Sequence, residues 1–263
     1  MIIDFHTHFF PDKIARESID KLAKHANARY FGDGTLKGLL EFMEKDGIDI
    51  SVNQPVATRA EQVLSINRRM IEVSREYPQI VCFGSMHPDF DDCDKELAFL
   101  AAQGIRGIKM HPDYQNFHPG DKRMRAIYES LVKNKLILLL HSGVDLAYEE
   151  VHSTPPEIKE MLKLKGLKVV LAHMGAYKLW DDVEKYLVGE DVYFDLAYCD
   201  EMENAQLQRI ILAHGPEKIL FATDFPWERG LTMLRKLDSL NLSKEDRDKI
   251  LYKNALSLLK MPL

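Results

Sequence analysis

The chain opens on a short apolar segment that runs directly into a His-x-His pair, Ile2-Ile3-Asp4-Phe5-His6-Thr7-His8. Alternate residues of a β-strand lie on one face, so His6 and His8 can direct both imidazoles to one metal ion, with their backbones roughly 6.6 Å apart. The alternative is that they are two ordinary polar residues at an exposed chain end. The segment favours a metalloenzyme as the first hypothesis.

Three later apolar runs of strand length also end on a residue type that binds metal. These runs are Leu136–His141, Lys168–His173 and Ile219–Asp224. Their length and composition are typical of strands buried on both faces of a parallel sheet. Only ten of the 263 residues are His, so repeated chance placement at strand ends is a poor explanation.

Strand-like runs alternate with amphipathic stretches along the whole chain. We predict strands at Ile2–His6, Ile48–Gln54, Ile80–Met86, Gly107–His111, Leu136–His141, Val169–His173, Val192–Leu196 and Ile219–Asp224. We predict helices at Asp12–His25, Leu36–Lys45, Ala60–Tyr77, Asp92–Gln103, Lys122–Lys133, Pro156–Lys165, Lys178–Leu187, Glu201–His214 and Ser243–Lys260. About eight such units in roughly 250 residues is the size of a TIM barrel, and a doubly wound open sheet is the alternative.

The positions of the candidate site residues favour the barrel. All of them fall at the C-terminal ends of predicted strands: His6, His8, His111, His141, His173 and Asp224. In a closed barrel these ends surround one mouth, where active sites form, whereas in an open sheet the same strands would lie far apart. We therefore expect an α/β fold, a distorted TIM (β/α)8 barrel, with residues 1–263 forming a single domain.

Composition argues against several classes of protein. The 35 Lys and Arg and 41 Asp and Glu give a net charge of -6 with scattered basic residues, so nucleic acid is not an expected partner. Three dispersed cysteines do not suit a disulfide framework or a zinc finger. Asp4 and His6 interrupt any signal peptide, and the apolar run before His141 is too short to span a bilayer. We expect a cytoplasmic protein with no membrane partner.

These motifs together resemble the amidohydrolase superfamily, and within it the amidohydrolase-related branch that includes aminocarboxymuconate-semialdehyde decarboxylase. The resemblance covers nearly the whole chain and rests on five segments in order: Asp4-Phe5-His6-Thr7-His8, Lys109-Met110-His111-Pro112, His141-Ser142-Gly143, Ala172-His173-Met174-Gly175 and Ala222-Thr223-Asp224-Phe225-Pro226. The resemblance implies a metal-dependent enzyme on a TIM-barrel fold, and homodimers are common in this branch.

The resemblance also implies a ligand set for one divalent ion per chain, Zn²⁺ or another such as Mn²⁺. The ligands would be His6, His8, His141 and Asp224. A mixed imidazole and carboxylate set with an open position suits catalytic zinc, which lowers the pKa of bound water toward 7. His173 is expected beside that water as acid or base, and Asp224 is expected to carry a proton to the leaving group. For His173 the alternative is a structural histidine of the core.

Four residues near strand ends are candidates for substrate binding: Lys109, His111, Tyr114 and Trp227. Lys109 and His111 share one strand face, so both point into the barrel if either does. Tyr114 and Trp227 follow strand ends, where barrel loops carry specificity. In binuclear relatives a lysine on this strand is carboxylated and bridges two ions, so a bridging Lys109 is the alternative. The Lys-x-His-Pro form resembles the mononuclear members instead.

Two reactions fit such a site. The first is hydrolysis, in which metal-bound hydroxide attacks an amide, ester or lactone carbonyl of a small substrate. The second is non-oxidative decarboxylation of a small aromatic or unsaturated carboxylate at the same metal site. The chain is shorter than the known decarboxylases, which favours the hydrolase.

Two further functions are less well supported. A TatD-type deoxyribonuclease needs a strand-three glutamate, which Cys82–His87 does not contain. A non-catalytic metal-binding barrel would not need both His173 and Asp224.

Overall fold

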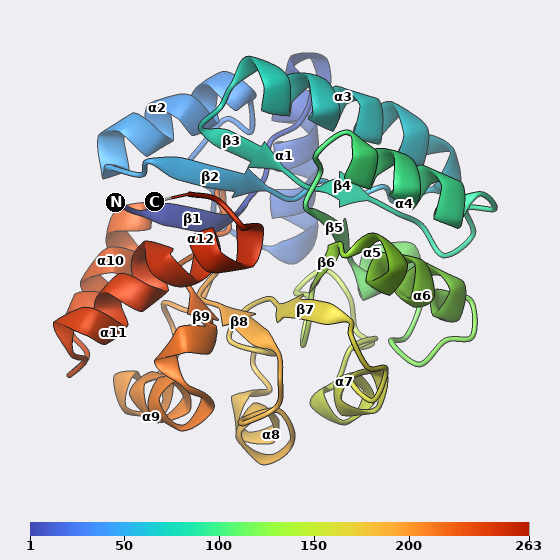
Figure 1. Cartoon of the computed structure of the whole chain (residues 1–263). Helices are drawn as coiled ribbons and strands as arrows, with labels where there is room; N and C mark the ends of the chain where they lie inside the picture. The colour runs from blue at the N-terminus through green and yellow to red at the C-terminus, as the bar shows by residue number, and fades with distance from the viewer. Residues whose placement is uncertain (263) are drawn as a thin grey trace. The chain divides into compact units, whose positions relative to one another are not determined.

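The computed structural model describes residues 1–262, and a strand forms within every predicted strand region. Most strand residues are buried, as expected for parallel strands that are covered on both faces. The strands, labelled in Figure 1, are β1 (Ile3–Thr7), β2 (Ile50–Asn53), β3 (Ile80–Cys82), β4 (Gly84–Ser85), β5 (Gly107–Met110), β6 (Ile137–Leu140), β7 (Lys168–Leu171), β8 (Tyr193–Asp195) and β9 (Ile219–Leu220).

Helices connect these strands, and several begin at side-chain caps. Thr35 Oγ1 accepts the Gly38 amide at 2.9 Å at the start of α2, and Thr154 forms a capping box with Glu157 at the start of α7. The α-helices are α1 (Asp12–Ala26), α2 (Leu36–Asp46), α3 (Val63–Glu76), α4 (Cys93–Ala102), α5 (Pro112–Gln115), α6 (Met124–Asn134), α7 (Pro155–Met161), α8 (Trp180–Tyr186), α9 (Asn204–His214), α10 (Gly230–Asp238), α11 (Lys244–Asp248) and α12 (Asn254–Leu259).

The elements differ from the sequence prediction in several places. The predicted strand Ile80–Met86 is divided into β3 and β4, and the predicted helix Pro156–Lys165 ends at Met161. Helices α5 and α10 were not predicted. Helix α5 has a proline in its first turn and a side-chain cap from His111, but its four residues are too few to show periodicity, and α10 begins at a glycine with no side-chain cap before it.

The chain forms two compact units, of which the first contains Met1–Asn53, Asp145–Glu149 and the chain from Val188 onward. Within it β1 pairs in parallel with β2, and β8 pairs in parallel with β9. The Phe5 N–H donates to Phe221 O at 2.9 Å, so β1 also lies beside the segment that follows β9. The first strand and the last strand region of the chain are therefore neighbours.

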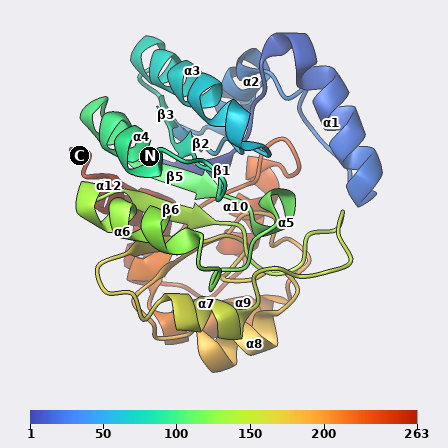
Figure 2. The ribbon, with the colours of Figure 1, turned by 90° about the vertical axis from the view of Figure 1, so that its right-hand side faces the viewer.

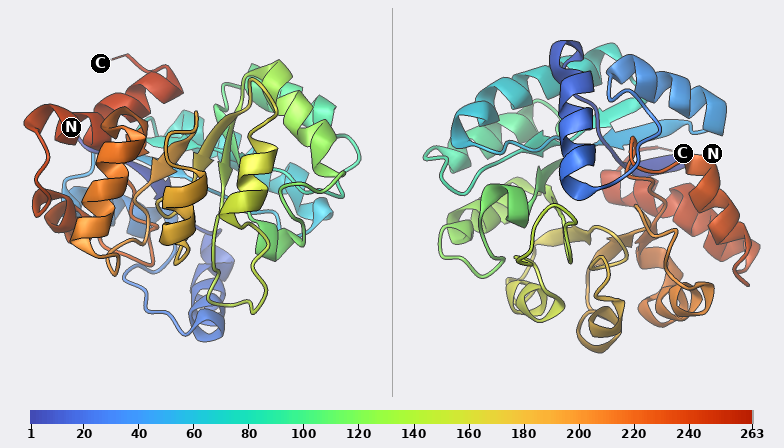
Figure 3. Two further views of the ribbon diagram at one scale, coloured as in Figure 1. Left: turned by 90° about the horizontal axis from the view of Figure 1, so that it is seen from below. Right: turned by 180° about the vertical axis from the view of Figure 1, so that it is seen from behind.

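The C-terminal helices belong to this first unit. In Figure 3, α11 and α12 appear in red, and the π-helical segment Lys249–Lys253 joins them. The Phe221 N–H donates to Ile250 O at 2.9 Å, which ties this run to the end of β9.

The second unit contains Gln54–Val144 and Glu150–Leu187. Strands β4, β5, β6 and β7 pair in parallel in that order. Helices α3, α4 and α6 run side by side over these strands (Figure 2). All four residues of β6 are buried, so this strand forms part of the core. None of the helices formed by residues 1–262 is both long enough and apolar enough to span a membrane.

Candidate metal centre

The predicted metal and catalytic residues lie at or just beyond the C-terminal ends of strands. His6 lies in β1, and His8 and His141 directly follow β1 and β6. His173 and Asp224 lie beyond the ends of β7 and β9, with φ of 61° and 67°. The prediction that these strands continue to His173 and Asp224 is therefore wrong, because both residues adopt the left-handed conformation of a turn.

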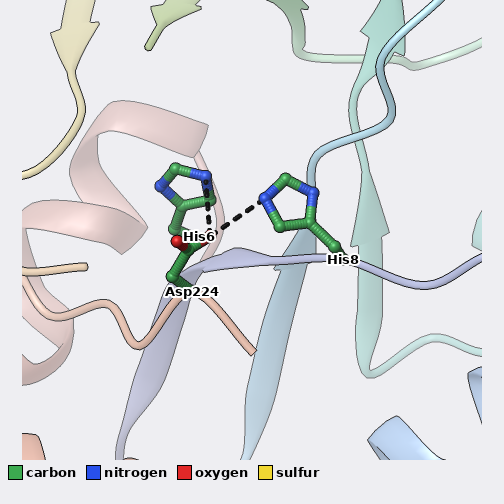
Figure 4. A group of neighbouring side chains, drawn as sticks. All are labelled: His6, His8 and Asp224. Carbon is green, nitrogen blue, oxygen red and sulfur yellow. Dashed lines mark ion pairs between the residues drawn. The ribbon is translucent and has the colours of Figure 1, made fainter. Parts of the chain in front are cut away.

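Three predicted ligands converge within the first unit (Figure 4). Asp224 Oδ1 lies 3.0 Å from His8 Nε2 and 3.5 Å from His6 Nε2, and one ligand atom of each residue lies within 4.8 Å of the others. The His6 side chain is 1% exposed, whereas those of His8 and Asp224 are 18% and 13% exposed. Two imidazole nitrogens and a carboxylate oxygen, reachable from solvent, form a donor set that suits a divalent transition metal.

Backbone hydrogen bonds fix the Asp224 turn against β1. The Asp224 N–H donates to His6 O at 2.8 Å, and the His8 N–H donates to Phe225 O at 2.7 Å. Thr7 and Phe225 also form a parallel bridge. A carboxylate near the C-terminal end of the chain is thereby held beside two histidines at the N-terminal end.

Asp4 supports the same turn from inside the protein. Its buried carboxylate accepts hydrogen bonds from the Thr223 hydroxyl at 2.6 Å, the Thr223 N–H at 3.0 Å and the His6 N–H at 3.2 Å. Burial raises the pKa of Asp4 to about 7, although these hydrogen bonds act in the opposite direction. Asp4 therefore joins the residue before Asp224 to the strand that carries His6.

A second carboxylate, Asp195 at the end of β8, orients the His6 ring. Its Oδ2 lies 2.9 Å from His6 Nδ1, and its side chain is fully buried. When Nδ1 donates its proton to Asp195, Nε2 carries the lone pair that a metal requires. Sequence reasoning did not identify Asp195. The available signal was a carboxylate inside the apolar run Val192–Leu196.

The second unit gathers four other predicted site residues. His173 Nε2 lies 3.1 Å from His141 Nδ1, and the rings of His111 and His141 stack with centroids 3.9 Å apart. The Tyr114 ring packs edge-on against His111 at 4.4 Å. All three histidines are buried. This group can pass a proton between rings and present an aromatic and imidazole surface to a ligand.

A buried carboxylate, Asp113, lies within this histidine group. Its Oδ1 lies 3.0 Å from His152 Nδ1, and its Oδ2 lies 3.7 Å from His111 Nδ1 and 3.8 Å from His141 Nε2. Sequence reasoning gave His152 no role and did not identify Asp113. The signal for Asp113 was its position directly after the Lys-x-His-Pro motif, whereas its contact with His152 is between residues distant in sequence.

The remaining candidates lie near these groups in sequence. Lys109 is 1% exposed in β5, opposite Ser85 and Leu139 on the neighbouring strands. Trp227 is half-buried, and its N–H donates to Asp224 O at 2.9 Å. Their substrate contacts, the carboxylation of Lys109 and the role of His141 as a further ligand of the ion at His6 stay predictions.

Parallel β-α units that carry a His-x-His pair and a carboxylate at their strand ends define a class of metal-dependent α/β enzymes. Residues 3–261 match the family model described as Amidohydrolase. The chain therefore belongs to the amidohydrolase family, as its motifs predict, and is an enzyme.

Solved structures confirm the predicted fold. A TIM-barrel protein from Bordetella bronchiseptica is 18% identical with a TM-score of 0.81, covering 98% of both chains. A 5-carboxyvanillate decarboxylase variant from Novosphingobium aromaticivorans, with bound manganese, is 14% identical with a TM-score of 0.76, covering 99% of this chain and 97% of that one. A probable 2-pyrone-4,6-dicarboxylic acid hydrolase from Acinetobacter baumannii, with bound citric acid, is 16% identical with a TM-score of 0.70, covering 99% of both. The fold is a distorted TIM barrel, and the doubly wound alternative is wrong.

One curated relative is similar in sequence. A dihydroorotase from Mycosarcoma maydis is 24% identical over 151 residues, which are 50% of this chain. The matched region is only 36% of that protein's length.

Proposed function

We propose that this enzyme is a metal-dependent hydrolase that cleaves an amide, ester or lactone bond of a small substrate. The observation that carries the proposal is the convergence of His6 Nε2, His8 Nε2 and Asp224 Oδ1, with Asp195 fixing the His6 ring. These donors fit one Zn²⁺ ion per chain, and Mn²⁺ suits the same imidazole and carboxylate set.

The ligands have separate parts in the proposed reaction. His6 and His8 would hold the ion through Nε2, and Asp195 would keep the His6 ring in the required tautomer. His141 is the proposed further ligand. A divalent ion in this site would lower the pKa of a coordinated water and polarise a substrate carbonyl.

Proton transfer is assigned to two residues. Asp224 would take a proton at a carboxylate oxygen and deliver it to the leaving group. His173 would act as an acid or base, because imidazole exchanges protons near neutral pH and its Nε2 lies 3.1 Å from His141 Nδ1. Hydrolysis needs both steps, since water must lose a proton and the departing heteroatom must gain one.

The proposed substrate is a small carboxylate that carries an unsaturated or aromatic ring. Lys109, His111, Tyr114 and Trp227 are the proposed binding residues, and they supply one cation, one imidazole and two aromatic rings. Two structural neighbours support this class of substrate by their names, a pyrone-dicarboxylic acid hydrolase and a carboxyvanillate decarboxylase.

Decarboxylation of such a carboxylate is the second candidate function. It is supported by the whole-chain similarity to 5-carboxyvanillate decarboxylase, a structure that contains manganese. The same metal site would serve this reaction, in which carbon dioxide leaves and the ring carbon gains a proton.

Isotope labelling separates the two reactions. Metal-loaded enzyme is incubated in H₂¹⁸O with ring lactones, esters and amides, and in D₂O with aromatic and unsaturated acids labelled with ¹³C at the carboxyl group. We expect ¹⁸O in the hydrolysed product and no ¹³CO₂. Release of ¹³CO₂ with deuterium on the ring would assign the decarboxylase instead. The variant His6→Ala is the control, and product formation by it would contradict the metal site.

Four further proposals concern organisation, location and partners. The match over residues 3–261 supports one amidohydrolase domain, and light scattering is the test of the homodimer. A cytoplasmic location and the absence of nucleic-acid and membrane partners rest on composition and are tested by fractionation of cells.

A further inference from the structure

A second group of potential metal ligands lies in the second unit. It comprises His118, in the loop after α5, and Glu150 and His152, in the loop before α7. One ligand atom of each residue lies within 4.8 Å of the others. The proposed reaction uses none of these three residues. Two imidazoles and one glutamate form a set that binds zinc in enzymes with open coordination positions.

A buried carboxylate orients His152. Asp113 Oδ1 lies 3.0 Å from His152 Nδ1 and also accepts the His152 N–H at 3.2 Å. The Asp113 side chain is fully buried. When Nδ1 donates to this carboxylate, the lone pair of the ring lies on Nε2, as in the carboxylate-histidine pairs behind known metal ligands.

A second carboxylate orients His118 in the same way. Glu157 Oε1 lies 2.9 Å from His118 Nδ1, and Glu157 Oε2 accepts from the Thr154 hydroxyl at 2.7 Å. Glu157 Oε2 also accepts the Thr154 N–H at 3.0 Å. Glu157 is therefore held in place where it contacts the imidazole of His118.

The two oriented rings face the same small region. The centroids of His118 and His152 are 4.8 Å apart, and His118 Nε2 lies 4.0 Å from Glu150 Oε1. Hydrogen bonds fix both loops. The Asp121 N–H donates to His118 O at 2.9 Å, and the Ser153 hydroxyl donates to His141 O at 3.1 Å.

Access to this group is open. His152 is 11% exposed, His118 is 43% exposed and Glu150 is 74% exposed. His118 and Glu157 also line a surface pocket together with Gly120, Asp121 and Glu160. An ion can therefore enter from solvent and retain water at the coordination positions that protein atoms do not fill.

We propose that His118, Glu150 and His152 bind a second divalent cation, of the kind that imidazole and carboxylate ligands select, such as Zn²⁺. His118 and His152 would bind through Nε2, and Glu150 would close onto the ion from the solvent side. If the chain binds two ions, the second ion then has a binding site that does not require a carboxylated Lys109.

The test is a titration of chelator-treated, full-length protein with Zn²⁺ alone, followed by a count of equivalents bound. We expect two equivalents for the unmodified chain and one fewer for the double variant His118→Asn, Glu150→Gln. The double variant His25→Asn, Glu149→Gln makes the same changes at exposed positions outside the group and is expected to bind two. An unchanged count in His118→Asn, Glu150→Gln would overturn the proposal.

This experiment separates the new site from the proposed hydrolase site. The variant His6→Ala is expected to bind one equivalent of Zn²⁺. Adding His118→Asn and Glu150→Gln to this variant should remove that equivalent. If the unmodified chain binds one equivalent, and only His118→Asn, Glu150→Gln removes it, the second site stands and the His6 site fails.

A subtler variant tests the part assigned to the supporting carboxylate. Glu157→Gln is expected to weaken Zn²⁺ binding at this site by about 10- to 100-fold, the usual effect of losing a partner behind a metal ligand. Binding that depends on His6 should not change. Equal affinity in Glu157→Gln and the unmodified chain would contradict the orienting role of Glu157.

Discussion

The two units of the chain use histidine and carboxylate in opposite arrangements. In the first unit the partly exposed Asp224 lies in front of His6 and His8, and the buried Asp195 lies behind His6. In the second unit the histidine rings of His111 and His141 pack against each other, and the buried Asp113 contacts the group. The same residue types thus form a converging donor set around Asp224 and a packed imidazole group around His141.

This difference has a chemical consequence. A carboxylate oxygen and two imidazole nitrogens that lie close together can bind one cation, and the cation neutralises the charge of the carboxylate. Imidazoles that stack and hydrogen-bond to one another can instead relay protons or contact a ligand. We therefore assign metal binding first to His6, His8 and Asp224, and to His173 in the second unit we assign a part in proton transfer, beside that of Asp224, but none in metal binding.

The largest effect is expected for His6→Ala. This change removes one ligand and the partner of Asp195, so the equivalent of metal that depends on His6 and turnover should both be lost. Metal per chain is measured by elemental analysis of protein purified without chelators or a metal-affinity tag. His25→Ala, at an exposed helical position, is the control and should keep both. Metal retained in His6→Ala at the His6-dependent level of the unmodified chain would show that the opening motif is not a ligand pair.

A smaller effect is expected for His173→Asn, which should keep the metal and lower kcat about 100- to 10,000-fold, the usual contribution of general acid–base catalysis. The kcat–pH profile should also lose one limb. His214→Asn is the matched control, since His214 is buried but holds Val192 O at 2.9 Å in a structural contact. Loss of metal in His173→Asn would break the division of roles between the units.

The next effect concerns a positioning residue. Asp195→Asn should leave the ligands in place but weaken metal binding about 10- to 100-fold, because the His6 ring loses its charged partner. Competition with a chelator of known affinity measures the change. Asp191→Asn, an exposed aspartate paired with Lys218, serves as control and should bind metal normally. Normal affinity in Asp195→Asn would reduce Asp195 to a packing residue.

The smallest effect is a pH dependence of stability. The pKa of Asp4 is raised from 3.8 to about 7 in the folded chain. Its contribution to the free energy of unfolding is therefore most favourable at low pH and is lost as pH rises through this interval. In metal-free protein, Asp4→Asn should therefore gain unfolding free energy relative to the unmodified chain between pH 5 and pH 8. Urea denaturation at both pH values measures this, and a constant difference between the two proteins would refute the raised pKa of Asp4.

Local pattern was sufficient to predict the strand regions and much of the site. The apolar runs before His141 and His173 contain β6 and β7, and the rings of His6 and His8, which the period of two places on one strand face, both lie within 3.5 Å of Asp224 Oδ1. These features depend on residues that are close in sequence, so local composition and spacing are enough to predict them.

The supporting carboxylates could not be predicted in this way. Asp195 meets His6 across 189 positions, and Asp113 meets His152 across 39. Each contact depends on which strand ends become neighbours after folding, and an aspartate in an apolar run does not specify its partner. The turns at His173 and Asp224 were missed for a related reason, since left-handed backbone at a non-glycine residue has no strong sequence signal.

The most direct test of the central claim is anomalous X-ray diffraction from crystals of the unmodified enzyme grown with Zn²⁺, with data collected on both sides of the zinc absorption edge. We predict a zinc-specific peak bonded to His6 Nε2, His8 Nε2 and an Asp224 carboxylate oxygen. Zinc bound elsewhere in the chain, with no peak among these three side chains, would contradict the claim that they form the metal centre.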